Sequence, residues 1–129
     1  MIVGTGIDLV EIERITALME RQPKLAVRVL TRAEQAAMPS APRRKAEYLA
    51  GRYAVKEAVA KALGTGIGAA ISFQDIEIVK DELGKPHLKL APEALKRFKQ
   101  FEHTEDVCFH VSITHGKQHA IAQVIIELR

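Results

Sequence analysis

One segment rich in Ala, Lys, Glu and Leu, from about Arg44 to Leu63, constrains the fold of this chain more than any other feature. These residue types have high helix propensity. Gly64 follows directly and can adopt the left-handed conformation that commonly ends a helix. We therefore expect a long helix here, and we expect it to lie at the centre of the molecule.

The residues before this segment change their periodicity at Glu11. Residues 2–10 are β-branched and interrupted by glycine, which predicts a short strand with close backbone approach and with Asp8 near its end. After Glu11, apolar residues recur on one helical face, namely Ile12, Ile15 and Met19. Pro23 predicts a break in this helix.

The remaining segments predict short helices and antiparallel strands. Thr31 and Glu34 have the spacing of a capping box, which opens a short helix. Pro92 suits the first turn of another helix, expected to carry Leu95, Phe98 and Phe101. Strands are expected over residues 73–79, 87–90, 107–115 and 120–128, the last two as a hairpin. We therefore predict one α+β domain, residues 1–129, with an antiparallel sheet packed on the central helix.

Composition excludes several classes of protein. Apolar side chains make up 47% of the chain and charged ones 27%, an ordinary balance for a globular domain. No apolar run approaches the roughly 20 residues of a membrane span, and the N-terminus does not resemble a secretion signal. A cytoplasmic protein without membrane contact is expected. The net charge of +3 favours anionic partners, but 5% aromatic residues offer no obvious platform for nucleic acid.

The central helix carries the residues with the clearest chemical potential. Glu57 and Lys61 are one helical turn apart, with Arg52 nearby and the glycine-rich stretch 64–68 directly after the helix. Fixed positive charge beside flexible backbone N–H groups at Gly64 and Gly66 suits a polyphosphate. A surface Glu–Lys pair followed by a glycine helix cap is the alternative interpretation, and both stay open at this point.

Asp8 also allows two interpretations. An aspartate just before a helix often caps its free N–H groups. Together with Glu57, from a separate segment, it would instead form a hard oxygen site suited to Mg²⁺. No pair of histidines has the spacing of a zinc site. Serine catalysis is poorly supported, because no serine lies in a Gly-x-Ser-x-Gly motif.

Four segments, taken together, resemble the holo-(acyl-carrier-protein) synthase family of phosphopantetheinyl transferases. They are Gly4-Thr5-Gly6-Ile7-Asp8, Leu30 to Glu34, Leu49 to Gly66 with its Lys56-Glu57 and Lys61, and His110 to His115. Their order and spacing cover almost the whole chain. The stretch from Lys96 to Asp106 matches no pattern of the family that we can identify.

The resemblance implies an activity and a set of ligands. Members transfer the 4'-phosphopantetheine arm of coenzyme A to a serine of an acyl carrier protein, releasing 3',5'-ADP. The family fold is α+β, usually a homotrimer with coenzyme A bound between neighbouring subunits. The resemblance assigns Mg²⁺ to Asp8 and Glu57 and the phosphates to Lys61, so these three are the expected catalytic residues.

Further residues are expected to bind the two substrates. Arg44, in the basic stretch before the central helix, and Arg52 resemble coenzyme contacts, and His110 lies on the strand that resembles a wall of the nucleotide pocket. Because acyl carrier proteins are acidic, a basic and apolar stripe is predicted to be the docking face: Arg14, Leu18, Arg21 and Leu25. The alternative is that Leu18 and Leu25 pack inside.

Two rival functions are also kept. One is the same chemistry on a carrier domain of a polyketide or peptide synthetase. The other is a non-catalytic oligomeric nucleotide-binding module, in which Asp8 caps a helix and Glu57 pairs with Lys61.

Overall fold

The computed structural model describes residues 1–101 and 106–129. Its elements are, in chain order, β1 (Ile2–Glu11), α1 (Ile12–Arg21), α2 (Leu25–Val29), α3 (Arg32–Ala37), α4 (Pro42–Leu63), the 3₁₀ turn η1 (Phe73–Asp75), β2 (Ile76–Lys80), β3 (Pro86–Leu90), α5 (Pro92–Leu95), the 3₁₀ turn η2 (Lys99–Phe101), β4 (Val107–His115) and β5 (His119–Leu128). The α+β class predicted from the sequence is confirmed.

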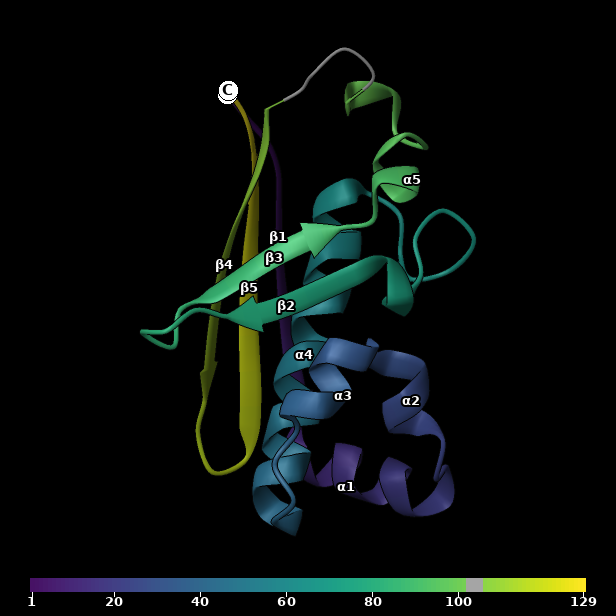
Figure 1. Cartoon of the computed structure of the whole chain (residues 1–129), viewed down its shortest axis with the longest axis vertical. Coiled ribbons are helices and arrows are strands. Elements are labelled where there is room, and N and C mark those ends of the chain that lie inside the picture. The colour runs from purple at the N-terminus through teal and green to yellow at the C-terminus, as the bar shows by residue number, and fades with distance from the viewer. Residues whose placement is uncertain (102–105) are drawn as a thin grey trace.

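Helix α4 is the predicted central helix, and it begins slightly earlier than expected. Pro42 occupies its first turn, where the missing N–H costs nothing, and Gly64 ends it in the left-handed conformation with φ 80°. Small side chains along one side of α4 are almost fully buried, namely Ala46, Ala50, Ala54 and Ala58. Their size lets the helix approach neighbouring strands closely, and Figure 1 shows α4 running beside β1 and β5 and behind β2 and β3.

The main sheet has three antiparallel strands in the order β1-β5-β4. The N-terminal strand thus pairs with the C-terminal one, with Asp8 opposite Ala122, and the predicted terminal hairpin forms the β4–β5 pair. One face of this sheet packs on α4 through buried residues such as Ala122, Val124 and Ile126. The other face is turned away from α4.

The expected single sheet is in fact two, because β2 and β3 form a separate antiparallel pair. The strand expected over residues 73–79 begins only at Ile76. Before it, Phe73–Asp75 forms a 3₁₀ turn, because the Asp75 carboxylate accepts the Ser72 N–H at 2.9 Å and closes a tight local cap. The helix expected after Pro92 is also short, with η2 continuing to Phe101 as a separate turn.

A buried ion pair joins the helices to the smaller sheet. The Lys56 Nζ donates to Glu34 Oε1 at 2.7 Å and to the carbonyl oxygens of Val29 at 2.6 Å and Phe73 at 3.0 Å. The Glu34 carboxylate also accepts the N–H of Thr31, completing the predicted capping box, and the N–H of Ile78 in β2. One pair therefore connects α4, α2, α3 and β2.

Over residues 1–101 and 106–129, no helix combines the length and the apolar character required to cross a bilayer.

Candidate active site

Two glycines of β1 bring Asp8 to the side of α4. A Cβ atom at Gly4 would collide with the carbonyl oxygen of Ala62, and one at Gly6 with that of Ala58. Only glycine therefore permits this contact between the backbones of the strand and the helix. The contact places Asp8 beside the last turns of α4, where Lys61 donates to Asp8 Oδ1 and to the Ile7 carbonyl oxygen, each at 3.0 Å.

Asp8 and Glu57 line one cavity, together with Tyr53, Arg14 and Leu18. Burial raises the pKa of Glu57, and the negative charge of Asp8 raises it further, while the Tyr53 hydroxyl and Lys61 act in the opposite direction. Burial also raises the pKa of Tyr53, and the charge of Glu57 adds to this effect. A cation bound between two carboxylates that interact in this way would stabilise their negative charges. The hard oxygen ligands predicted for Mg²⁺ are thus brought together.

The structure excludes one of the two interpretations of Asp8. The N-cap of α1 is Glu11, which makes no side-chain capping hydrogen bond, so the interpretation of Asp8 as the cap of this helix is wrong. The acidic partner of Lys61 is Asp8, from β1. Sequence spacing alone suggests Glu57 as the partner of Lys61, because these two residues are one helical turn apart. Asp8 lies far away in the sequence, so its contact with Lys61 depends on the fold.

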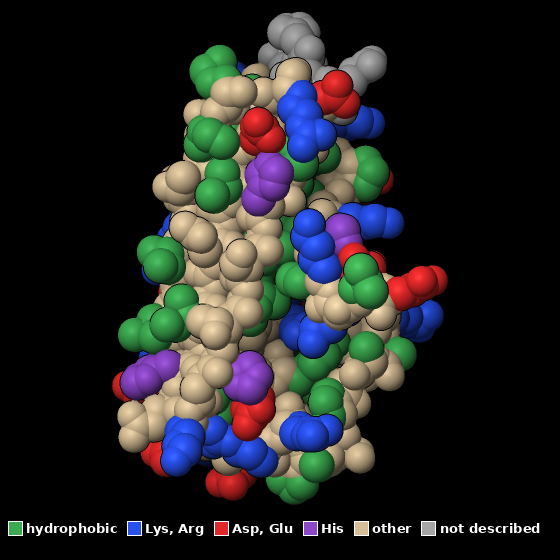
Figure 2. All heavy atoms as spheres, turned by 90° about the vertical axis from the view of Figure 1, so that its left-hand side faces the viewer, with side chains coloured by type: hydrophobic (Ala, Val, Ile, Leu, Met, Phe, Trp, Pro, Cys, Tyr) green, Lys and Arg blue, Asp and Glu red, His purple; other side chains and the backbone are tan. Residues whose placement is uncertain are grey.

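A second cavity, of about 490 Å³, lies between the start of α4, the β2–β3 turn and β4. Its charged or hydrogen-bonding lining residues are Arg44, Glu47, Tyr48, Arg52, Lys80 and His115. Of these, Arg44 and Arg52 were predicted. Tyr48, Lys80 and His115 were not, because they come from three segments that only the fold brings together. Figure 2 shows Lys and Arg side chains gathered beside the sheet on one face of the molecule.

Arg52 is the most unusual side chain of this cavity. Its residue is only 6% exposed, and its guanidinium lies over the ring of Tyr48, 4.0 Å from the ring centroid. Among the buried side-chain atoms of residues 1–101 and 106–129, its Nε has no hydrogen-bond partner. A buried cation with an unsatisfied donor at the wall of a cavity is well suited to an anionic ligand.

Other residues predicted for the coenzyme lie outside these two cavities. Gly64 donates its N–H to the Lys61 carbonyl oxygen at 3.0 Å, and Gly66 has φ 140°, so both glycines shape the turn after α4. His110 lies on β4, and its Nε2 is 2.9 Å from Glu127 Oε1. Their ligand roles stay predictions.

The predicted docking stripe needs one correction. Arg14 and Leu18 border the Asp8 cavity, and Arg21 is exposed at the end of α1. Leu25, however, is only 4% exposed and belongs to the core. The reason is the break near Pro23: α1 ends at Arg21, and a new helix directs Leu25 inward.

The fold is that of a known class of transferases. Residues 4–124 match the family model of the 4'-phosphopantetheinyl transferase superfamily, and the chain belongs to this family. It is 52% identical to the holo-[acyl-carrier-protein] synthase of Geobacillus kaustophilus, over 98% of this chain and 90% of that protein. It is 47% identical to the synthase of Bacillus subtilis, over 98% of this chain and 97% of that one.

Solved structures agree with this assignment. The holo-(acyl-carrier-protein) synthase of Bacillus anthracis, in complex with CoA (3',5'-ADP), matches with a TM-score of 0.78 and 40% identity, over 98% of this chain and 97% of that one. The Helicobacter pylori synthase in complex with coenzyme A matches with a TM-score of 0.81 and 34% identity, over 95% and 99% of the two chains.

Proposed function

We propose that this protein is a holo-(acyl-carrier-protein) synthase, which transfers 4'-phosphopantetheine from coenzyme A to a serine of apo-acyl carrier protein and releases 3',5'-ADP. The observation that carries the proposal is the meeting of Asp8, Glu57 and Lys61 where β1 contacts α4. The family and the relatives named above supply the substrates. We place this reaction in the cytoplasm and in fatty acid synthesis.

Asp8 and Glu57 are the residues that would hold Mg²⁺. They fit the ion because both are carboxylates, and because the negative charge of Asp8 contributes to the raised pKa of Glu57. When bound, the ion supplies positive charge that neutralises the pyrophosphate of coenzyme A. The two carboxylates therefore define the place at which the phosphates are held.

Lys61 is placed to act on the transferring phosphoryl group. Its side chain is 54% exposed, so it can exchange its contact with Asp8 for a phosphate oxygen at little cost. A positive charge in this position stabilises the charge that develops as the carrier serine attacks the phosphorus that bears pantetheine. The bond from that phosphorus to 3',5'-ADP breaks in the same displacement.

Arg44 and Arg52 are proposed to hold the nucleotide half of coenzyme A. The unsatisfied Arg52 Nε and the cluster of cationic side chains suit its phosphate groups. Lys80, which lines the same cavity, is expected to add to the positive field there, and His115 offers a further hydrogen-bonding group. The nucleotide and the reacting phosphates would thus be held by different parts of α4.

The acyl carrier protein is proposed to dock beside the Asp8 cavity. Arg14 and Leu18 border that cavity on α1, and Arg21 is the last residue of the same helix. Cationic and apolar groups side by side suit an acidic helix. Such a partner would deliver its serine next to the proposed metal ligands.

A homotrimer is the proposed assembly. The outer face of the main sheet carries exposed Ile7 and Leu9, which are 62% and 61% exposed, and the partly exposed Ile121, which pairs with Leu9 in register. Apolar side chains grouped on one sheet face favour contact with another protein surface. We propose that neighbouring copies cover the part of this face that carries Ile7, Leu9 and Ile121, and that they complete the coenzyme sites. Leu9→Glu should then produce monomers, as measured by light scattering.

The test of the proposed function is direct. The protein is incubated with coenzyme A, Mg²⁺ and apo-acyl carrier protein, and intact mass spectrometry follows the carrier. We expect a gain of one phosphopantetheine group, and none on a carrier whose acceptor serine is replaced by alanine. The Asp8→Ala variant, if it is folded, should also give none.

Two outcomes would contradict the proposal. Modification of only synthetase carrier domains, tested in parallel, would assign the same chemistry to a different partner. Binding of coenzyme A without modification of any carrier would indicate a non-catalytic nucleotide-binding module.

A further inference from the structure

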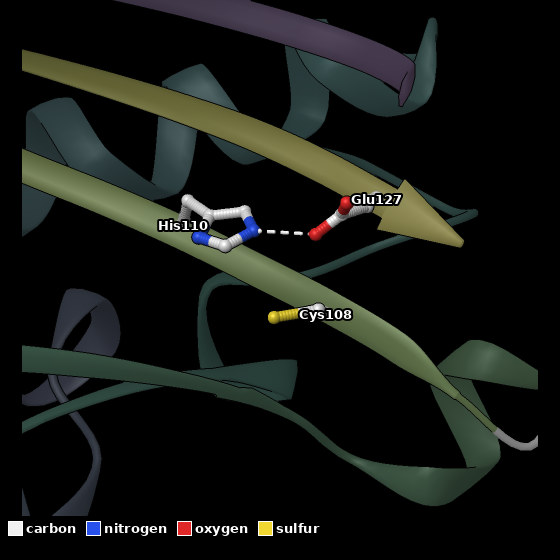
Figure 3. A group of neighbouring side chains, drawn as sticks. All are labelled: Cys108, His110 and Glu127. Atoms are coloured by element: carbon white, nitrogen blue, oxygen red, sulfur yellow. Dashed lines mark hydrogen bonds and ion pairs between the residues drawn. The ribbon is translucent and has the colours of Figure 1, made fainter. Parts of the chain in front are cut away.

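Three potential metal ligands converge on the outer face of the main sheet. Cys108 and His110 are two residues apart on β4, and Glu127 on β5 lies opposite Cys108 in the register. Residues with this relation share one face of a sheet. Figure 3 shows the three side chains together, and their ligand atoms all lie within 4.8 Å of one another.

We propose that Cys108, His110 and Glu127 form a binding site for Zn²⁺, a function that goes beyond the proposed transfer reaction. A thiolate, an imidazole and a carboxylate are the three ligand types that zinc uses in proteins. The thiolate and imidazole also distinguish this site from the all-oxygen pair of Asp8 and Glu57, which suits Mg²⁺.

The distances fit a single ion after small side-chain rotations. Zinc–ligand bonds of about 2.0–2.3 Å place neighbouring ligand atoms of a tetrahedral ion roughly 3.3–3.7 Å apart. His110 Nε2 and Glu127 Oε1 are now 2.9 Å apart, so an ion would separate them slightly while Cys108 moves closer. Three ligands from one chain leave the fourth position for water. The site lies where β4 begins and β5 ends, at the other end of the sheet face from Leu9 and Ile121.

The surrounding charges both help and oppose a cation. The His110 ring and the Glu127 carboxylate already face each other, with His110 Nε2 2.9 Å from Glu127 Oε1. The Arg129 guanidinium opposes a cation, because its Nε lies 3.5 Å from Glu127 Oε1. That side chain is 61% exposed and can turn away into solvent when an ion binds.

Cobalt(II) provides a direct probe of this site. Reduced, untagged protein without coenzyme A is titrated with Co²⁺ in excess Mg²⁺, which occupies the hard oxygen site. Cys108 is the single cysteine of the sequence, so a thiolate-to-cobalt charge-transfer band reports on it alone. We expect this band with a tetrahedral ligand-field spectrum, one Co²⁺ per chain, and loss of both signals on addition of Zn²⁺.

Variants then test each ligand and its opposing charge. His110→Ala and Glu127→Gln should each weaken Co²⁺ binding at least about tenfold, and Cys108→Ser should remove the band. Arg129→Ala should tighten binding. His87→Ala is the matched control and should change nothing, because His87 forms an equivalent 2.9 Å pair with Asp81 elsewhere on the surface.

Three results would overturn the proposal. They are the absence of the charge-transfer band, a band insensitive to His110→Ala and Glu127→Gln, and one Co²⁺ held by thiolates of two chains. Because the readout is binding and not catalysis, failure here is distinct from failure of the proposed function.

Discussion

Two lysines of α4 pair with carboxylates of other elements, and the two pairs have opposite surroundings. Lys56 and Glu34 are 2.7 Å apart, and neither side chain is exposed to solvent. Lys61, five residues further along α4, lies 3.0 Å from Asp8 of β1, and these side chains are 54% and 15% exposed. The chemical groups are the same, and only their burial and their additional partners differ.

This difference separates structure from function. Burial lowers the pKa of Lys56, and its hydrogen bond with Glu34 counteracts this effect, so the buried charge depends on a full set of partners. Lys56 therefore cannot leave its position without leaving Glu34 unpaired in the core. Lys61 has solvent around it, and its contact with Asp8 contributes at most about 1 kcal/mol. The weaker pair is the one that a substrate phosphate can replace.

The largest expected effect is on the buried pair. Lys56→Met should lower the free energy of unfolding by about 3–5 kcal/mol, because Glu34 would keep a buried charge without its partner. The double variant Lys56→Met/Glu34→Gln should recover part of this loss. Urea denaturation of wild type and both variants measures the coupling, and a loss below about 1 kcal/mol in Lys56→Met would contradict the role of the pair as a structural clamp.

The exposed pair should show the reverse behaviour. Lys61→Ala should change stability by less than about 1 kcal/mol but lower kcat by roughly 10²–10³-fold, the usual effect of removing one transition-state contact. Steady-state kinetics and urea denaturation on the same preparation separate the two quantities. An unchanged kcat with a raised KM for coenzyme A would reassign Lys61 to ground-state binding.

A smaller effect is expected beyond the pair, at the proposed docking surface. Arg14→Glu should raise KM for the carrier protein about tenfold at low salt, and less at high salt, because charge reversal opposes an acidic partner. KM for coenzyme A should stay unchanged. Arg32→Glu, exposed on α3, is the matched control. Equal losses for both substrates would instead indicate a nucleotide role or a folding defect.

The smallest effect concerns pH and the cluster of Asp8 with Glu57. Because the folded-state pKa of Glu57 is raised, the native protein binds more protons than the unfolded chain above the ordinary value of 4.5. The free energy of unfolding should therefore fall as pH rises through this window. In metal-free protein at pH 7, Glu57→Gln should raise Tm by about 1–3 °C, and near pH 4 the two proteins should agree.

Magnesium should reverse this ranking. Adding Mg²⁺ at pH 7 should raise the Tm of wild type, because the ion binds the folded carboxylates, and should raise that of Glu57→Gln much less. Differential scanning calorimetry at both pH values measures these shifts. An equal response of both proteins to Mg²⁺ would remove Glu57 from the proposed metal site.

Local signals in the sequence predicted most elements correctly. The capping box of Thr31 and Glu34, the glycine after Leu63 and the alternation in the terminal hairpin each act within a few residues. The wrong predictions occur where a side chain competes with the pattern. Asp75 converts the start of a strand into a 3₁₀ turn, and the break at Pro23 directs Leu25 into the core.

What the sequence determined by itself is the set of local conformations and the candidate residues Asp8, Glu57 and Lys61. Only the tertiary structure decided their partners: Asp8 for Lys61, Glu34 for Lys56, and Glu127 for His110. It also assembled the cavity that Arg52 shares with Lys80 and His115. The physical reason is that helix propensity, capping and alternation depend on neighbours in the chain, whereas burial, strand register and the distance between charges depend on segments that meet only in the folded protein.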